Sequence, residues 1–317
     1  MITRMRVTVA VAALVVSALG VSTPASAEDG HHDEHAAKTV VYILDNSTHG
    51  NPEGVAWDGR FFYVGATGDG TIYRGSLGDR VVHTFIAGKT GRAAIGLKVF
   101  EGRLYVAGGT TGKIFVYDLA RPAAAPVTLE TGPGGFLNDL VVTGEGDIYI
   151  TDSFRPTLWH VAPGQVKTGG IVDAISVSPE IPYAGSPAFN LNGIVAFRGG
   201  RELLVVNSSD GKLYRIRFDH GGRRITPVVA PPLVGGDGMI VDHGALIVVR
   251  GNPASLSVLK LASRRSRATL VEVIGNATLR GPSTVAAADE RYLVVNADFA
   301  TSTRPFTVSG LPRQLNR

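Results

Sequence analysis

One pattern recurs six times along this chain: a small or polar turn, an apolar strand, a hairpin marked by glycine or charge, and a second strand. The repeats begin at residues 53, 95, 138, 192, 237 and 282, so most are 42 to 45 residues apart, with a longer interval after residue 138. A period in the forties with several short strands per unit is typical of β-propeller blades. A β-sandwich of similar length would explain the strands but not the period.

Further short strands follow in several repeats, and no segment keeps helical periodicity, so the sequence predicts a nearly all-β fold. The sixth repeat ends one strand short, near residues 306–309, whereas the apolar segment 39–44 precedes the first repeat and has no partner. We therefore expect a six-bladed β-propeller closed by an N-terminal strand pairing into the last blade. Such closure removes open sheet edges.

The N-terminus has the features of an export signal. Arg4 and Arg6 precede an apolar run over residues 7–21, and small residues lead to Ala27. A basic region, an apolar stretch shorter than the roughly 20 residues of a membrane span and a small-residue site together predict a secretory signal peptide, residues 1–27. An uncleaved anchor is the alternative. We expect a secreted, extracytoplasmic protein.

The rest of the chain divides into a flexible polar leader at 28–37, the propeller at 38–310 and a tail at 311–317. His31, His32 and His35 in the leader either bind a transition metal or are simply solvated. Residues 163–189 form a long insertion between the third and fourth repeats, and we expect it to overhang one face of the propeller.

Composition narrows the function classes. The chain has no cysteine, which excludes disulfides, thiolate catalysis and cysteine-based metal sites. The formal charge of +4 falls to +2 when the two signal arginines are removed, which gives no argument for nucleic-acid binding. We expect a small-molecule partner and no membrane insertion after signal cleavage; the oligomeric state is not predicted.

In a propeller the innermost strand of each blade faces the central channel, so the first positions of the repeats form a ring. They are Glu53, Ile95, Asn138, Asn192, Asp237 and Pro282. Four carry side-chain oxygens and two are carboxylates, a set that suits one hard divalent cation, with Ca²⁺ the best match. The lack of histidine and cysteine disfavours zinc and copper. The alternative is turn chemistry, because Asn-Gly and Asp-Gly are common turn dipeptides.

Four short motifs in order resemble the senescence-marker-protein, gluconolactonase and luciferin-regenerating-enzyme family, which is related in fold to paraoxonases and strictosidine synthases. They lie at 52–54, at 137–139 leading to 148–153, at 191–193 leading to 205–208, and at 236–238. The resemblance covers essentially the whole mature chain. It implies a six-bladed propeller with a divalent ion, often calcium, and lactone hydrolysis in many members.

The resemblance also implies residue roles. Glu53, Asn192 and Asp237 take the positions of the family's metal ligands, with Asn138 as a ligand or substrate contact. Asp237 takes the position of the proposed general base, while the metal polarises the lactone carbonyl and orients a water. Sugar lactonases of the family often have an arginine two residues before the Asn138 position. This chain has Phe136 there as the expected substrate contact, which indicates a less polar substrate than gluconolactone.

Two functions stay open at this stage. The first is a secreted, calcium-dependent hydrolase of the lactonase or esterase type, which opens a lactone or related ester with metal-activated water. The second is a non-catalytic propeller that keeps the metal for stability and binds a small molecule or protein, since a fold alone does not define an activity.

Overall fold

The computed structural model describes residues 38–219 and 222–313. The expected signal peptide 1–27, the leader 28–37 with its histidines and the last four residues of the expected tail lie outside the described residues. Nearly all regular structure within the described residues is β-strand. This confirms the all-β fold class that the sequence predicts.

The described strands form five hydrogen-bonded sheets, one of which joins two blade-like groups through β1 (Val40–Leu44), so we distinguish six groups, here called blades 1 to 6 in chain order. Blade 1 contains β2 (Pro52–Trp57), β3 (Phe62–Ala66), β4 (Ile72–Gly75) and β5 (Val81–Ile86). Blade 2 contains β6 (Leu97–Phe100), β7 (Arg103–Ala107), β8 (Lys113–Asp118) and β9 (Val127–Glu130). Blade 3 contains β10 (Leu137–Val142), β11 (Ile148–Asp152), β12 (Thr157–Val161) and β14 (Asp173–Ser176).

The remaining blades follow the same plan. Blade 4 contains β15 (Leu191–Phe197), β16 (Glu202–Asn207), β17 (Lys212–Asp219) and β18 (Gly222–Val228). Blade 5 contains β19 (Gly236–Asp242), β20 (Ala245–Arg250), β21 (Ser255–Leu261) and β22 (Ala268–Ile274). Blade 6 contains β23 (Pro282–Ala288), β24 (Arg291–Asn296) and β25 (Thr307–Pro312).

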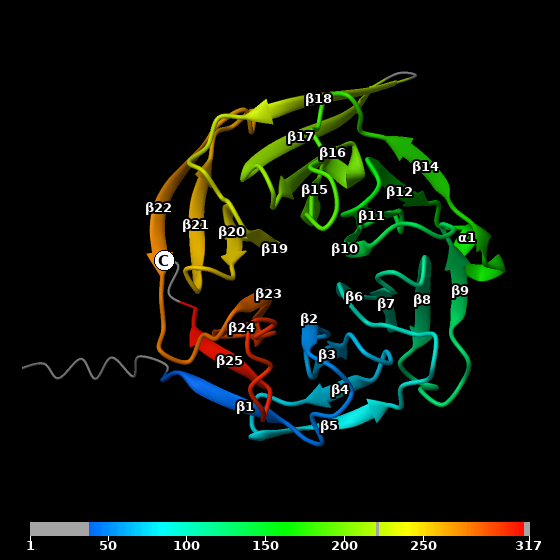
Figure 1. The fold of residues 1–317 in the computed structure, drawn as a ribbon, viewed down its shortest axis with the longest axis vertical. Helices are drawn as coiled ribbons and strands as arrows, with labels where there is room; N and C mark the ends of the chain where they lie inside the picture. Colours follow the sequence, from blue (N-terminus) through cyan, green and yellow to red (C-terminus); the bar gives the residue numbers. More distant parts are fainter. Residues whose placement is uncertain (1–37, 220–221, 314–317) are drawn as a thin grey trace, which may run out of the picture. The chain divides into compact units, whose positions relative to one another are not determined.

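Within each blade, successive strands pair antiparallel, and the blades surround a common centre (Figure 1). The first strand of each blade faces that centre, and the last strands of blades 1 to 5 lie at the periphery. This is the arrangement of a β-propeller. The repeat therefore places one equivalent residue from the start of each blade around a single axis.

The burial of the strands follows from this arrangement. Every residue of β3, β11 and β16 is buried, because each blade packs between two neighbours and both of its faces are covered. The apolar clusters lie between adjacent blades; Tyr63 of blade 1, for example, packs in one cluster with Leu104 of blade 2. The peripheral strands β14 and β22 are mostly exposed. In the sequence, the inner strands are therefore mostly apolar at consecutive positions instead of alternating between apolar and polar residues.

A pairing irregularity recurs at the inner end of the first strands. In β2 the register shifts between Pro52 and Val55, and β10, β15, β19 and β23 shift at the equivalent place. The two skipped residues leave the strand ladder, which re-aims their side chains, as β-bulges beside functional sites do. In β23 the shift lies between Pro282 and Val285. The ring position of blade 6 is therefore Ser283, and the expected Pro282 is wrong by one residue.

The N-terminal strand β1 (Val40–Leu44) lies beside the last strand of the chain. It pairs antiparallel with β25 from Val40↔Gly310 to Ile43↔Thr307, and it also meets β5 in parallel at Ile43↔Val81. Tyr42 in β1 is fully buried, and its ring lies 5.1 Å from that of Phe62 in blade 1.

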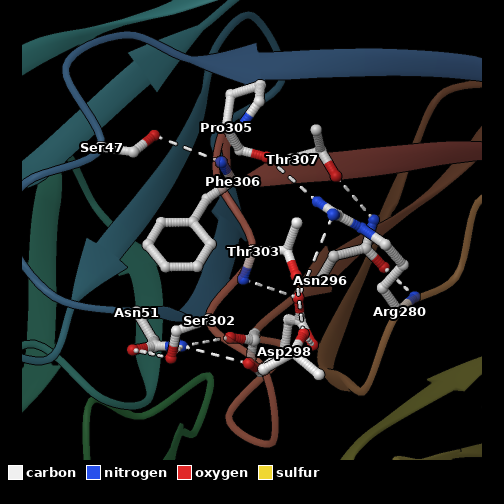
Figure 2. Close-up of polar contacts among 12 residues, drawn as sticks. Ser47, Asn51, Arg280, Asn296, Asp298, Ser302, Thr303, Pro305, Phe306 and Thr307 are labelled. Atoms are coloured by element: carbon white, nitrogen blue, oxygen red, sulfur yellow. Dashed lines mark hydrogen bonds and ion pairs between the residues drawn. The ribbon is translucent and has the colours of Figure 1, made fainter.

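A loop of blade 6 makes further contacts to the segment between β1 and β2 (Figure 2). Asn51 donates from Nδ2 to the carbonyl oxygen of Ala297 at 2.8 Å and to Ser302 Oγ at 3.0 Å. Phe306 donates its N–H to Ser47 Oγ at 3.3 Å. Asp298 holds the loop itself, since Oδ2 accepts from the N–H of Thr303 at 3.0 Å. These bonds satisfy polar groups where the first and last blades meet.

Two segments differ from the sequence-based boundaries. The insertion 163–189 contains helix α1 (Gln165–Thr168), strand β13 (Gly170–Ile171), which extends the sheet of blade 2, and β14, the fourth strand of blade 3. Only its last part remains a loop. The strand β25 continues to Pro312, into the expected tail, because Leu311 pairs with Tyr292 and is buried.

A 3₁₀ turn, η1 (Arg198–Gly200), joins β15 to β16. Among the residues that the structure describes, no helix is long and apolar enough to cross a membrane.

Candidate functional site

The ring residues are brought together by direct contacts between neighbouring first strands. Gly96 of blade 2 donates its N–H to the carbonyl oxygen of Asn138 at 2.8 Å. Ser283 of blade 6 donates from Oγ to the carbonyl oxygen of Glu53 at 2.7 Å. A Cβ on Gly193 would lie only 2.3 Å from the carbonyl oxygen of Asp237, so only glycine allows this approach. The first strands therefore hold their ring residues close to one another.

The side chains of the ring have oxygens that no protein group satisfies. Among the described residues, seven buried side-chain polar atoms have no hydrogen-bond partner. Five of them are oxygens of the ring or of the residue beside it: Glu53 Oε2, Asn138 Oδ1, Asp139 Oδ2, Asn192 Oδ1 and Asp237 Oδ1. An unpaired buried polar atom costs about 1–3 kcal/mol, so five in one place mark this centre as a candidate binding site.

The two asparagines are oriented by serines on the neighbouring strand. Asn138 donates from Nδ2 to Ser153 Oγ at 2.9 Å, and Ser153 in turn donates to the carbonyl oxygen of Leu191 at 2.6 Å. The same relay runs from Asn192 to Ser208 at 3.2 Å. Because each amide nitrogen is engaged, each amide oxygen is the atom left free.

The electrostatics of the ring disfavour the ionised form of its carboxyl groups. Burial, together with the charges of Asp237 and Asp139, raises the pKa of Glu53 well above its usual range. Burial and the charge of Asp139 raise the pKa of Asp237 to about 8, although Asn192 and the N–H of Gly238 moderate the rise by hydrogen bonding. Carboxylates that repel one another in a buried site are stabilised in their ionised form by a bound cation.

Two residues of this centre are missing from the sequence-based set. Asp139 is 4% exposed, and its Oδ1 accepts from Lys98 Nζ at 3.2 Å. The charge of Lys98 also reaches Glu53, where it offsets part of the rise in the Glu53 pKa. The signal for Asp139 was present: the equivalent positions in four other blades are glycine, at residues 54, 96, 193 and 238. Lys98 is a charge in an inner strand, three residues after Ile95.

The expected substrate contact Phe136 lies beside the ring. A Cβ built on Gly109 would lie 3.1 Å from Ile95 Cγ1 and 3.5 Å from Phe136 Cε2, so these two side chains lie on either side of one small volume. The Phe136 side chain is partly buried, and its N–H donates to Asp152 Oδ1 at 2.9 Å. The structure therefore places an aromatic wall next to the apolar member of the ring.

Other possible sites are less suited to a metal. In the part of the chain that the structure describes, no group of three or more His, Cys, Asp or Glu side chains is arranged to hold a metal ion, and the ring itself relies on two asparagine amides. Two surface cavities, of about 730 and 470 Å³, lie elsewhere. The larger one is lined by Arg198, Arg201, Glu202, Arg217, Phe218 and Asp219.

The fold and the ring define a β-propeller with a polar centre. Comparison with solved structures shows the same fold in a luciferin-regenerating enzyme, with a TM-score of 0.60 and 15% identity over 86% of this chain and 95% of that one. A gluconolactonase from Xanthomonas campestris matches with a TM-score of 0.62 and 17% identity, over 84% of this chain and 87% of the other.

The virginiamycin B lyase of Staphylococcus aureus is also similar, with a TM-score of 0.57 and 12% identity over 87% of this chain and 99% of that one. These matches confirm the fold resemblance expected from the motifs. The fold is found both in a protein named as a gluconolactonase and in one named as a lyase. No protein-family profile matches the sequence, and no curated protein matches it.

Proposed function

We propose that the protein is a secreted, calcium-dependent hydrolase that opens a lactone or related ester at the centre of the propeller. The observation that carries the proposal is the set of five buried, unpartnered oxygens contributed by blades 1, 3, 4 and 5. The fold shared with luciferin-regenerating enzyme and gluconolactonase supports the same reading. Nothing else within the described residues combines carboxylates, orphaned oxygens and close strand contacts in this way.

The donor set fits a hard dication. Glu53, Asn138, Asn192 and Asp237 supply two carboxylates and two amide oxygens, and calcium accepts mixed oxygen ligands in irregular geometry. When bound, such a cation polarises a carbonyl oxygen and lowers the pKa of a water. Asp139 adds a third negative charge beside the ligands, which Lys98 offsets at 3.2 Å.

In this proposal, residues of the chain position the reacting groups and move the proton. Asn138 and Asn192, whose amide nitrogens are held by Ser153 and Ser208, would present their amide oxygens to the cation, and a carboxylate oxygen of Asp237 accepts a proton of the attacking water. The water oxygen bonds to the acyl carbon, the ester C–O bond breaks, and the proton passes from Asp237 to the leaving oxygen. The products are a hydroxyl group and a carboxylic acid, which releases its remaining proton to solvent. Ile95 and Phe136 exclude bulk water on one side.

The deciding experiment measures calcium content, thermal stability and lactone or ester hydrolysis before and after chelation. We compare the wild type with the Glu53→Gln/Asp237→Asn double variant, using Glu272→Gln on the exposed strand β22 as a control. One calcium per chain, a chelation-induced fall in Tm and calcium-dependent hydrolysis, all lost only in the double variant, support the proposal. No metal in the wild type refutes it. Calcium without turnover favours a non-catalytic propeller that binds a ligand.

We also propose that β1 closes the propeller. Its pairing with β25 and its contact with β5 link the last blade to the first. A chain that starts at residue 45 should melt at a much lower temperature than one that starts at residue 38, because β25 loses its antiparallel partner and becomes an open edge. Equal melting temperatures would refute the closure.

Export is proposed from the sequence of residues 1–27 alone. N-terminal sequencing of the protein recovered from the culture medium should begin at Glu28. A recovered chain that retains the apolar run at 7–21 contradicts cleavage.

A further inference from the structure

Three phenylalanine rings form one cluster beside the ring of oxygens. The Phe136 ring centroid lies 5.0 Å from that of Phe189, edge to face, and 5.4 Å from that of Phe154. Phe154 and Phe189 are 5.2 Å apart. The three rings come from three separate loops, which precede β10, follow β11 and precede β15. We call them the phenylalanine cluster.

This cluster is not part of the propeller core. None of its rings belongs to the apolar clusters that pack between the blades in the described residues. Phe154 and Phe189 remain 39% and 43% exposed. Leaving large aromatic surface in water forgoes stabilisation of about 25 cal/mol per Å². Exposed aromatic rings gathered beside a polar centre form a candidate binding surface.

The backbone of the cluster is fixed by hydrogen bonds to a buried carboxylate. A single oxygen, Asp152 Oδ1, accepts the N–H groups of Phe136 at 2.9 Å and Phe154 at 3.0 Å. The other oxygen of Asp152, which is fully buried, accepts from Arg155 Nε at 2.7 Å and Trp159 Nε1 at 3.1 Å. One carboxylate therefore fixes the backbone of two of the three cluster residues.

The third ring is anchored to the same strand end. Asn190, which follows Phe189, is fully buried and donates from Nδ2 to the carbonyl oxygen of Ser153 at 3.0 Å. Ser153 also binds the amide of Asn138. The residues that fix the phenylalanine cluster thus lie directly beside those that orient a ring oxygen.

The cluster is close to the ring. Phe136 lies two residues before Asn138, and a Cβ built on Gly109 would lie 3.5 Å from Phe136 Cε2 and 3.1 Å from Cγ1 of Ile95, the buried ring member with a hydrocarbon side chain. A ligand with a polar head and an apolar substituent matches this arrangement, because the cation proposed above would bind the head while the substituent covers the exposed rings.

We propose that Phe136, Phe154 and Phe189 bind the alkyl substituent of a lactone whose carbonyl group lies at the ring of oxygens. This substrate class rests on the hydrolase function proposed above. The rigid anchoring by Asp152 and Asn190 keeps the cluster preorganised, so little conformational entropy is lost when a chain covers it. Phe154 and Phe189 are specificity-determining residues, and they take no part in the chemistry.

The test compares kcat/KM of the calcium-loaded protein for γ-butyrolactone, γ-octalactone and γ-undecalactone. Each buried methylene is worth about a two- to fourfold gain, so γ-octalactone should exceed γ-butyrolactone by about tenfold or more, mainly through KM. Phe154→Ala and Phe189→Ala should each lower this ratio several-fold. Ile171→Ala is the control, since Ile171 is 81% exposed on β13 at the edge of blade 2.

A binding arm separates the two proposals. The lactam 5-butylpyrrolidin-2-one resists hydrolysis and carries the same butyl chain as γ-octalactone, so calorimetry of this lactam reports binding without turnover. Lactam binding that weakens in both phenylalanine variants supports the cluster even if no lactone is hydrolysed, and in that case only the hydrolase function fails.

Two results overturn the inference. Hydrolysis with a chain-length ratio near one, or a ratio unchanged in Phe154→Ala and Phe189→Ala, refutes the alkyl site and leaves the hydrolase function standing. Absence of both turnover and lactam binding refutes both proposals.

Discussion

The amide nitrogen of Asn138 donates a hydrogen bond to Ser153 Oγ at 2.9 Å, and this bond leaves Asn138 Oδ1 as a buried oxygen without a partner. Ser153 also donates to the carbonyl oxygen of Leu191 in blade 4. The Ser153 hydroxyl therefore connects blade 3 to blade 4 and also fixes the orientation of Asn138, a candidate metal ligand.

Ser153→Ala should weaken calcium binding about 10- to 100-fold, because residues that orient metal ligands have effects of that size. Ser208→Ala should act in the same direction through Asn192, since the contact is equivalent. Isothermal titration with calcium measures both, and Ser263→Ala in an exposed turn is the control. Unchanged affinity in both variants would contradict the role of the serines.

Lys98→Met should destabilise the calcium-free protein by about 1–3 kcal/mol, because it removes the ammonium group that Asp139, a buried carboxylate, accepts from. The same variant should bind calcium more tightly, since a positive charge near Glu53 is removed. Urea unfolding and calcium titration measure the two effects.

The matched control is the double variant Lys98→Met/Asp139→Asn, which removes both charges. It should recover most of the lost unfolding free energy, as pairs that depend on each other do. A loss as large as in the single variant would show that the lysine acts through packing alone.

Gly193→Ala should lower calcium affinity as well as stability. Its Cβ would meet the carbonyl oxygen of Asp237 at 2.3 Å, so blade 5 must move away from Asn192 in blade 4. We expect a loss of about 1–3 kcal/mol in unfolding free energy and a reduced calcium-induced rise in Tm. Gly144→Ala, where a Cβ meets nothing within 4 Å, is the control. Equal behaviour of the two variants would contradict the close approach.

The stability of the protein should fall in acid through Asp242. Burial alone would raise the pKa of Asp242, but hydrogen bonds from Arg313 and Tyr292 outweigh it and lower the pKa below its usual value. A carboxyl group with a lowered folded-state pKa stabilises the fold above its unfolded pKa of about 3.9 and loses this effect as the pH drops further.

Asp242→Asn should therefore cost stability at pH 7 and progressively less as the pH falls below about 4. Urea unfolding between neutral and acid pH measures the difference from the wild type. Asp79→Asn, at an exposed position, is the control. A difference that stays constant with pH would contradict the ion pair with Arg313.

The repeat predicted the inner strands well because the same physical demand, two covered faces, acts on each of them. It could not locate the pairing shift in β23, so the ring position fell on Pro282 instead of Ser283. Turn-like motifs located Glu53, Asn138, Asn192 and Asp237. That these residues share one centre depends on contacts between strands, which no single repeat encodes.

The site residues that the sequence analysis missed depend on contacts between residues that lie far apart in the sequence. Lys98 meets Asp139 across two blades, 41 positions apart. Phe154 and Phe189 join Phe136 only because Asp152 and Asn190 draw three loops together. Such side-chain networks depend on tertiary contacts, whereas the strands follow from local pattern.

The pairing of Val40 with Gly310 has a consequence for biosynthesis. β1, the first strand within the described residues, meets β5 early in synthesis, but its antiparallel partner β25 is made only near the end of the polypeptide. Blades 2 to 5 have all their strands within one stretch of sequence and are able to form during translation, whereas the sheet around β1 must wait. Nascent chains stalled before residue 307 should thus expose Tyr42 to proteases and chaperones, and release of the finished chain should protect it.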